Sequence, residues 1–271
     1  MRVSTVCRTM KRSRQSYYKA VQAKQRQEID SKILLNMIQP IRGKLPRVGG
    51  RKLHHMIKGE LGAKSIKIGR DRFFRWLKHQ DLLIKPKRSY AVTTQSNHRF
   101  WVYSNLIKQM NLTGPNQLWV SDITYLRTLE GFCYLALITD AYSRKIVGYD
   151  ISDSLELEGC LRAVRQASQT ASNLSQLIHH SDRGLQYCSN QYTQFLKNKG
   201  IKISMAAKGD CYENALAERV NGILKNEFNL DTTFKNKLQA IKAVHQSIRI
   251  YNQVRPHWSI GLQTPAQKHA A

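Results

Sequence analysis

Two different hydrophobic patterns divide the chain. Up to about residue 88, apolar side chains recur every three or four positions, which predicts a succession of helices. Breaks between these helices are expected at residues 39–40, 44–46 and 48–50, where proline or glycine occurs. Gly62 is expected to end the helix that carries the clearest apolar stripe. That stripe consists of Leu53, Met56, Ile57 and Leu61.

From residue 118 the pattern changes to the alternation that is typical of strands. Residues 118–126, 132–139 and 144–149 are separated by turn residues, so they predict an antiparallel meander. The later segments predict a helix at 155–168, a strand at 177–180, a helix at 189–199, a strand at 201–205 and a closing helix that carries Glu218. This β-β-β-α-β-α-β-α order is that of the RNase H fold, an α/β fold with a mixed sheet.

We therefore expect four parts. Residues 1–88 form a basic, all-α region of the helix-turn-helix type, and residues 89–117 form a connector with one short helix near 102–110. Residues 118–228 form the RNase H-like catalytic core, and residues 229–271 form a helical tail. In the tail, three polar residues either bind DNA or fix the last helix against the core. They are Asn252, Arg255 and His257.

The distribution of charge favours a nucleic-acid partner. The chain carries 44 Lys and Arg against 18 Asp and Glu, a formal charge of +26. Residues 1–100 hold 25 basic and 5 acidic side chains, a net charge of +20, whereas residues 101–271 hold 19 and 13, a net charge of +6. A strongly basic first third predicts a DNA-binding unit attached to a second function.

Two basic helices are candidates for that unit. Residues 69–78 combine apolar anchors with Arg70, Arg72 and Arg75, as the recognition helix of a helix-turn-helix would. The alternative is an ordinary basic helix whose charges face solvent. A second helix is expected over residues 15–24, with Ser13 as its N-terminal cap.

Composition also argues against several classes of protein. The five cysteines lie far apart, so neither a disulfide framework nor a cysteine-rich zinc site is indicated. No apolar run approaches the roughly 18 residues of a membrane span, and the basic start lacks the apolar stretch of a signal peptide. We therefore expect a cytoplasmic protein without membrane contact.

Three acids carry the candidate chemistry. Asp122 lies within the first predicted strand, Asp182 where the fourth strand ends, and Glu218 on the closing helix. Carboxylates that converge from different elements can hold two divalent metals roughly 4 Å apart, as reactions at phosphodiesters require. A charged acid within a strand is unfavourable unless a partner such as a cation binds it, and the alternative for Asp122 is a strand-end acid exposed to water. Gly184 is expected to permit the tight turn after Asp182.

Neighbouring acids are assigned structural roles. Asp140 is expected to anchor the turn that follows it. Asp210 and Glu213 fit the N-cap and N3 positions of a capping box at the start of the closing helix. Glu218 is preferred as the third acid because it shares a helix face with polar residues that suit a phosphate track. Those residues are Asn214, Asn221 and Lys225.

The motifs around these acids resemble those of a known family. Segments 119–125, 180–187 and 208–215, together with Glu218 and the tail segments 251–257 and 262–266, look like those of a DDE transposase of bacterial insertion sequences. The transposases that the chain resembles have a retroviral-integrase-like core and are encoded by the second of two overlapping frames. The resemblance extends over roughly residues 49–268.

The resemblance implies an enzyme that cleaves DNA 3′ ends and transfers them to a target. Asp122, Asp182 and Glu218 would bind two Mg²⁺ ions, for which Mn²⁺ can substitute, and one site would perform both steps. Lys225 would contact the element's terminal DNA. The implied partners are double-stranded DNA, further copies of the chain assembled on it, and an upstream-frame product fused to the chain. The implied location is the bacterial cytoplasm, at the nucleoid.

Other contacts with DNA rest on weaker signals. Asn221 belongs to the polar face of Glu218, and Arg183 and Lys208 lie in the two motifs, where solvated positive charge is the alternative. His180 shares a strand face with Asp182, which predicts a position near the site, and zinc is not expected.

Two alternative functions stay open. One is a different RNase H-fold nuclease that hydrolyses DNA without strand transfer, and the other is a truncated or decayed transposase that only binds DNA. Residues 48–51, Glu213 and residues 219–221 depart from the commoner patterns of the family. These departures leave the three acids intact and concern the fit of DNA around them.

Overall fold

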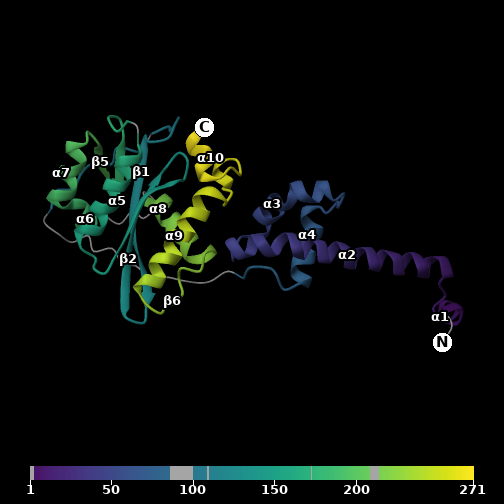
Figure 1. Ribbon diagram of the computed structural model, residues 1–271. Coiled ribbons are helices and arrows are strands. Elements are labelled where there is room, and N and C mark those ends of the chain that lie inside the picture. Colours follow the sequence, from purple (N-terminus) through teal and green to yellow (C-terminus); the bar gives the residue numbers. More distant parts are fainter. Residues whose placement is uncertain (1–2, 86–99, 109, 172, 208–213) are drawn as a thin grey trace. The chain divides into compact units, whose positions relative to one another are not determined.

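The computed structural model describes residues 3–85, 100–108, 110–171, 173–207 and 214–271 (Figure 1). The chain forms two compact units, Met1–Lys85 and Pro86–Ala271. The division falls within the basic stretch that precedes the predicted connector. Each unit has its own apolar core.

The described part of the first unit consists of helices α1 Val3–Thr9, α2 Arg14–Lys44, α3 Gly50–Ala63 and α4 Arg70–His79. Ser13 caps α2 as predicted, because its side chain accepts a hydrogen bond from the backbone N–H of Ser16 at 3.0 Å. The predicted break at residues 39–40 is wrong, since α2 continues through Pro40. Proline removes one backbone hydrogen bond, and burial of Met37 and Ile38 just before it offsets that loss.

Helices α3 and α4 complete this unit, and α3 packs against both α2 and α4. Trp76 Nε1 on α4 donates to Ser31 Oγ on α2 at 2.8 Å, which joins these two helices directly. Gly62 does not end α3, which runs to Ala63 because a glycine costs a helix only about 1 kcal/mol and the neighbouring Leu61 is buried. The core residues are Leu34, Met37, Ile38, Leu45, Val48, Leu53, Ile57, Leu61, Phe73 and Leu77.

The second unit is built on a mixed sheet of the RNase H-like kind that the sequence predicts. Its strand order is β3-β2-β1-β4-β5, and β6 pairs with the far end of β1. The β1–β2 and β2–β3 pairs are antiparallel, whereas β1, β4 and β5 run parallel. The strands are β1 Leu118–Thr128, β2 Gly131–Asp140, β3 Ile146–Ser152, β4 Ile178–Ser181, β5 Lys202–Met205 and β6 Thr233–Phe234. The helices are α5 Leu157–Thr170, α6 Leu185–Cys188, α7 Asn190–Asn198, α8 Ala215–Glu227, α9 Lys237–Gln253, the 3₁₀ helix η2 Trp258–Ile260 and α10 Pro265–Ala270.

Apolar side chains pack on both faces of this sheet. Trp119 faces the larger core with α5 and α7, whereas Val120 packs with Ala217 of α8 on the opposite face. This is the alternation predicted for β1. Gly148 on β3 allows α5 to approach closely, because a Cβ at this position would lie 2.3 Å from the carbonyl oxygen of Ala163.

The short helix predicted near residues 102–110 is absent from the described residues 101–108. Val102 and Tyr103 instead pack against the larger core, and the backbone N–H of Leu106 donates to Ser204 Oγ at 2.9 Å. Packing against the core and the hydrogen bond to β5 therefore override the local helical preference.

The tail belongs to the second unit and is fixed by polar contacts. Arg255 is 1% exposed and donates two hydrogen bonds of 2.7 Å to the Glu227 carboxylate at the end of α8. The Asn252 amide bonds both the N–H and the carbonyl of Ile146 at 3.0 Å. His257 is buried against the ring of Tyr251. Of the two alternatives for these three residues, attachment of the tail is therefore the one that the structure supports.

The four cysteines within the described residues, Cys7, Cys133, Cys160 and Cys188, are buried free thiols. No helix in the described ranges is long and apolar enough to cross a membrane.

Candidate active site

The site lies where β1 loses its neighbour β4. The parallel pairing of these strands ends at Ser121 and Ser181, and within the described part of the chain β1 has no strand on that side again until Arg127 pairs with β6. Asp122 and Asp182 are the next residues after the last pair. The end of the parallel pairing therefore brings both aspartates to one open edge of the sheet.

The carboxylate of Asp122 is held by α8 and is electrostatically strained. Asn221 Nδ2 donates to Asp122 Oδ2 at 2.8 Å. Removal from water, and then the nearby charge of Asp182, raise the pKa of Asp122 to about 7, although the Asn221 hydrogen bond acts in the opposite direction. Near neutral pH this group is therefore only partly ionised.

Asp182 is fixed by the turn that follows β4. Its Oδ1 accepts a hydrogen bond from the backbone N–H of Gly184 at 2.9 Å. The reason predicted for Gly184 is wrong, because its φ of −61° is accessible to any residue. A Cβ at Gly184 would lie 3.0 Å from Asp182 Oδ1, so the glycine instead leaves room for this carboxylate.

Glu218 lies in the first turn of α8 and is exposed. Its charge also raises the pKa of Asp122, but less than that of Asp182 does. Among the described residues, no group of three His, Cys, Asp or Glu side chains is close enough to hold a metal. The structure thus brings the two aspartates together. Glu218 lies near enough to influence Asp122, but the three acids are not close enough together to hold a metal as they stand.

The polar face of α8 differs from the predicted phosphate track. Asn214 and Asn221 are 4% and 5% exposed, and Asn214 Nδ2 donates to the carbonyl of Ser121 at 3.2 Å. The predicted contact of Asn221 with DNA is therefore replaced by support of Asp122, because the amide is buried against β1. The predicted DNA contact Lys208 and the capping box of Asp210 and Glu213 lie outside the described residues.

Lys225 remains a candidate for DNA contact. Its Nζ lies 5.7 Å from the centroid of the Tyr125 ring, beside the hairpin of β1 and β2. Burial lowers the pKa of Lys225, Asp122 raises it, and Arg127 lowers it again. The amine therefore lies within electrostatic range of both the carboxylate site and a second cation.

Arg183 and the two histidines support the strand ends. Arg183 Nε donates to the carbonyl of Ala206 at 2.8 Å, which connects the Asp182 turn to the end of β5. His180 is fully buried, and its Nδ1 lies 2.9 Å from Ser204 Oγ on β5, so the neighbouring strand holds its ring. His179 Nε2 lies 2.7 Å from Ser121 Oγ, and burial lowers the pKa of His179 to about 3.

Asp140 anchors its turn, as predicted. Its Oδ1 accepts from the backbone N–H and the hydroxyl of Ser143 at 2.7 and 2.6 Å, and its Oδ2 accepts from the N–H of Asn116 at 2.7 Å. Burial acts to raise the pKa of Asp140, but contacts with His269 and these donors outweigh it and lower the pKa. These hydrogen bonds assign Asp140 a structural role.

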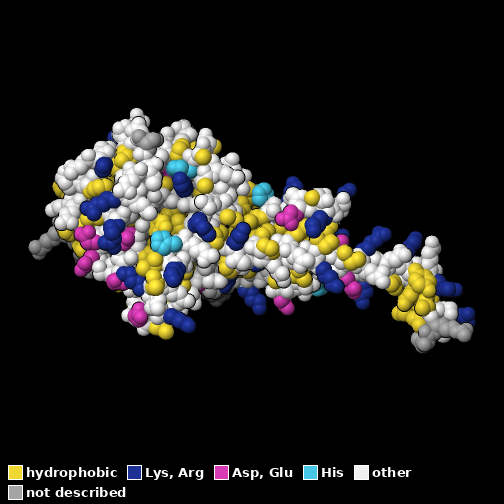
Figure 2. Space-filling view, viewed as in Figure 1, with side chains coloured by type: hydrophobic (Ala, Val, Ile, Leu, Met, Phe, Trp, Pro, Cys, Tyr) yellow, Lys and Arg dark blue, Asp and Glu magenta, His cyan; other side chains and the backbone are white. Residues whose placement is uncertain are grey.

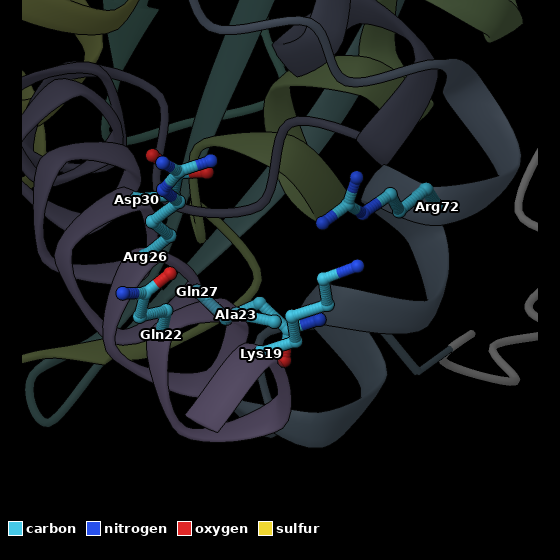
Figure 3. Close-up of a pocket in the computed structure, with 7 residues that line it drawn as sticks. All are labelled: Lys19, Gln22, Ala23, Arg26, Gln27, Asp30 and Arg72. Carbon is cyan, nitrogen blue, oxygen red and sulfur yellow. The ribbon is translucent and has the colours of Figure 1, made fainter. Parts of the chain in front are cut away.

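The three arginines of α4 that are predicted to recognise DNA differ from one another in their surroundings. Arg70 is paired with its exposed neighbour Asp71 at 2.9 Å, and Arg75 is exposed. Arg72 reaches toward Lys19 of α2 across a hollow of about 370 Å³ (Figure 3). The hollow is lined by Lys19, Gln22, Ala23, Arg26, Gln27, Asp30 and Arg72.

Comparison with known proteins adds independent information. Residues 113–211 match the family described as Integrase core domain, and residues 199–265 match a second family of that description. The chain is 38% identical over 267 residues to the Insertion element IS600 uncharacterized 31 kDa protein of Shigella sonnei, with 96% of each chain covered. It is 36% identical over 193 residues to Transposase InsF for insertion sequence IS3A of Escherichia coli strain K12, with 70% of this chain and 67% of that one covered.

A solved structure is similar in fold. The simian T-cell lymphotropic virus intasome in complex with PP2A regulatory subunit B56 gamma matches with a TM-score of 0.51 and 16% identity. The match covers 82% of this chain and 75% of that chain. At this identity the similarity concerns the fold alone.

The raised pKa of Asp122 predicts how its replacement changes stability. Because the folded-state pKa of about 7 exceeds the ordinary 3.8, the folded chain binds the proton more tightly, and stability falls as pH rises from about 4 to 7. In metal-free buffer, Asp122→Asn should therefore raise the free energy of unfolding at pH 8 by roughly 2–4 kcal/mol, with little change at pH 4.

Urea unfolding of both proteins at the two pH values measures this difference. Glu130→Gln, which removes an exposed carboxylate from the same hairpin, serves as the control and should show no such trend. If Asp122→Asn changed the free energy of unfolding equally at pH 4 and pH 8, the raised pKa of Asp122 would be contradicted.

Proposed function

The chain belongs to the insertion-element transposases that carry an integrase core domain, and we propose that Asp122, Asp182 and Glu218 are its catalytic residues. The reaction proposed for this site is cleavage that frees the DNA 3′ ends of the element, followed by their transfer to target DNA. The observation that carries the proposal is the pair of aspartates at the open edge of β1, with Glu218 close enough to influence the charge of Asp122.

The donors of this site fit divalent cations. Carboxylate oxygens are the ligands that Mg²⁺ prefers, and the charge of Asp182, which helps to raise the pKa of Asp122, makes this pair a site that positive charge stabilises. Two Mg²⁺ or Mn²⁺ ions bound by the three acids would supply activation of the attacking oxygen and stabilisation of the leaving 3′-oxygen. The chain itself orients Asp122 through Asn221 and Asp182 through the Gly184 N–H.

The proposed partners follow from the two reactions. Both ends of an element must be held together during transfer, so the active form contains more than one copy of the chain on double-stranded DNA. Fusion to the product of an upstream frame and a place at the bacterial nucleoid belong to the same proposal. Within this proposal, Lys225, whose amine Asp122 attracts, and Arg183, in the Asp182 turn, contact the phosphates near the scissile bond.

The first unit is proposed to bind the element's ends. Lys and Arg side chains are distributed along α2 and over α3 and α4 (Figure 2), and the hollow between α2 and α4 gathers Lys19, Arg26 and Arg72 around one opening. Asp30 is the acidic residue in that lining, so the net charge there is positive. Such a groove suits a DNA phosphate backbone, while exposed Arg75 is free to read base edges.

Catalysis is tested with a labelled end of the element, target DNA and Mg²⁺. Asp182→Asn and Glu218→Gln should each lower the rate of 3′-end release by more than roughly 100-fold, because each removes a proposed metal ligand. Loss of a residue that only supports a ligand costs roughly 10- to 100-fold. Glu130→Gln, an exposed acid of the hairpin, should retain the rate.

The products also separate the alternative functions. Appearance of a joined product together with the nick supports transposition, whereas nicking without joining would indicate a nuclease. Metal-independent binding with neither product would indicate a protein that only binds DNA.

The hollow between α2 and α4 makes a second prediction. The double variant Lys19→Ala/Arg72→Ala should weaken binding to DNA of any sequence and reduce the slope of log affinity against log salt by about two, since two phosphate contacts are lost. Lys24→Ala/Lys78→Ala removes the same charge from the same two helices outside the hollow. Fluorescence anisotropy at several salt concentrations measures both variants. An equal loss of slope in the two variants would show that only diffuse charge matters.

A further inference from the structure

The outer part of the β1–β2 hairpin has a mixed aromatic and basic face. Tyr125 and Arg127 are two residues apart on β1, so their side chains leave the same face of the strand. Their cross-strand partners on β2 are Tyr134 and Phe132. The four side chains therefore form a two-by-two array on the hairpin, which begins three residues beyond Asp122 in β1.

The three rings of this array form a connected cluster, here named the hairpin platform and defined as Tyr125, Phe132 and Tyr134. The centroid of the Tyr125 ring lies 5.9 Å from that of Tyr134 and 6.3 Å from that of Phe132, both edge to face. Phe132 is 56% exposed. One exposed apolar residue is ordinary, but a phenyl ring packed against the Tyr125 ring, which itself contacts Tyr134, presents an aromatic surface to solvent.

Two cations accompany the platform. Lys225 Nζ lies 5.7 Å from the centroid of Tyr125, and exposed Arg127 stands beside Tyr125 on the strand. Arg127 repels the Lys225 amine, whereas Asp122 and Asp231 attract it, and the effect of Asp122 is larger than that of Arg127. Two basic side chains from different elements, Lys225 of α8 and Arg127 of β1, thus lie close to the Tyr125 ring of the platform.

We propose that the hairpin platform binds unpaired nucleotides of the DNA strand that leaves the active site. Bases stack on Phe132 and its neighbouring rings, while Lys225 and Arg127 hold the backbone phosphates. Aromatic side chains for the bases next to cations for the phosphates are what single-stranded nucleic acid requires, and such binding is independent of sequence because every base has a π face. The inference rests on the proposed function, and it adds that base pairs beside the cleaved bond open and are held apart.

The test uses the full chain in metal-free buffer, so that no cleavage takes place. The probe is a thymidine oligonucleotide with one central 2-aminopurine, compared with a duplex of the same length. The native chain should quench 2-aminopurine fluorescence by stacking. Phe132→Ala should abolish the quench and weaken single-strand binding by about tenfold or more, with duplex binding unchanged.

Three matched variants make the result interpretable. Leu129→Ala removes a side chain that is 77% exposed on the same hairpin but has no ring, and it should behave like the native chain. Phe132→Tyr keeps a ring and should keep the quench. Arg127→Gln should keep the quench and lower the salt slope for single strands by about 0.7, because one phosphate contact is lost.

Several outcomes would overturn the proposal. One is that Phe132→Ala and Leu129→Ala quench 2-aminopurine equally and bind the single strand with equal affinity. Another is that Phe132→Ala keeps the quench and instead changes its oligomeric state in sedimentation. Because this assay contains no metal, a negative result would disprove binding by the hairpin platform but would not bear on metal-dependent cleavage. Conversely, if the chain failed to cleave DNA, an observed quench would still show that the hairpin platform stacks on bases.

Discussion

The unequal lengths of two parallel neighbours, β1 and β4, are the constraint on which the site depends. β1 has eleven residues, whereas β4 has four and turns away after Ser181. The edge that this exposes receives two carboxylates from different elements, one still within a strand and one in the turn. If β4 continued beside β1, its backbone would pair with this edge, and Asp182 would lie within a ladder instead of in a turn. The open edge therefore determines where negative charge collects.

The negative charges of the neighbouring carboxylates oppose folding, and contacts made by α8 hold these carboxylates in position. Asn214 and Asn221 attach α8 to β1 beside Asp122, and Arg255 holds the far end of the same helix through Glu227. Breaking a buried ion pair of that kind costs about 3–5 kcal/mol, so the tail stabilises the helix that carries Glu218. The acids thus lie on elements fixed at both ends, which is what a preorganised site requires.

Much of this arrangement could be predicted from the sequence. Alternation along residues 118–126 placed Asp122 on the face of Val120, and the turn after residue 181 placed Asp182 at a strand end, because both signals are local. The partner of Asn221 could not be predicted, since a helical face indicates which residues lie together but not which strand they meet. Long-range packing also explains why α2 continues through Pro40 and why residues 101–108 lie against the core without forming a helix.

The central claim is that Asp122 and Asp182 share an electrostatic strain that a divalent cation relieves. Calorimetric titration with Mg²⁺ at pH 7, repeated in buffers with different ionisation enthalpies, measures the protons released on binding. With the pKa of Asp122 at about 7, the account predicts release of roughly half a proton per chain, and none in Asp122→Asn. Binding of Mg²⁺ without proton release, or with the same release in the variant, would contradict it.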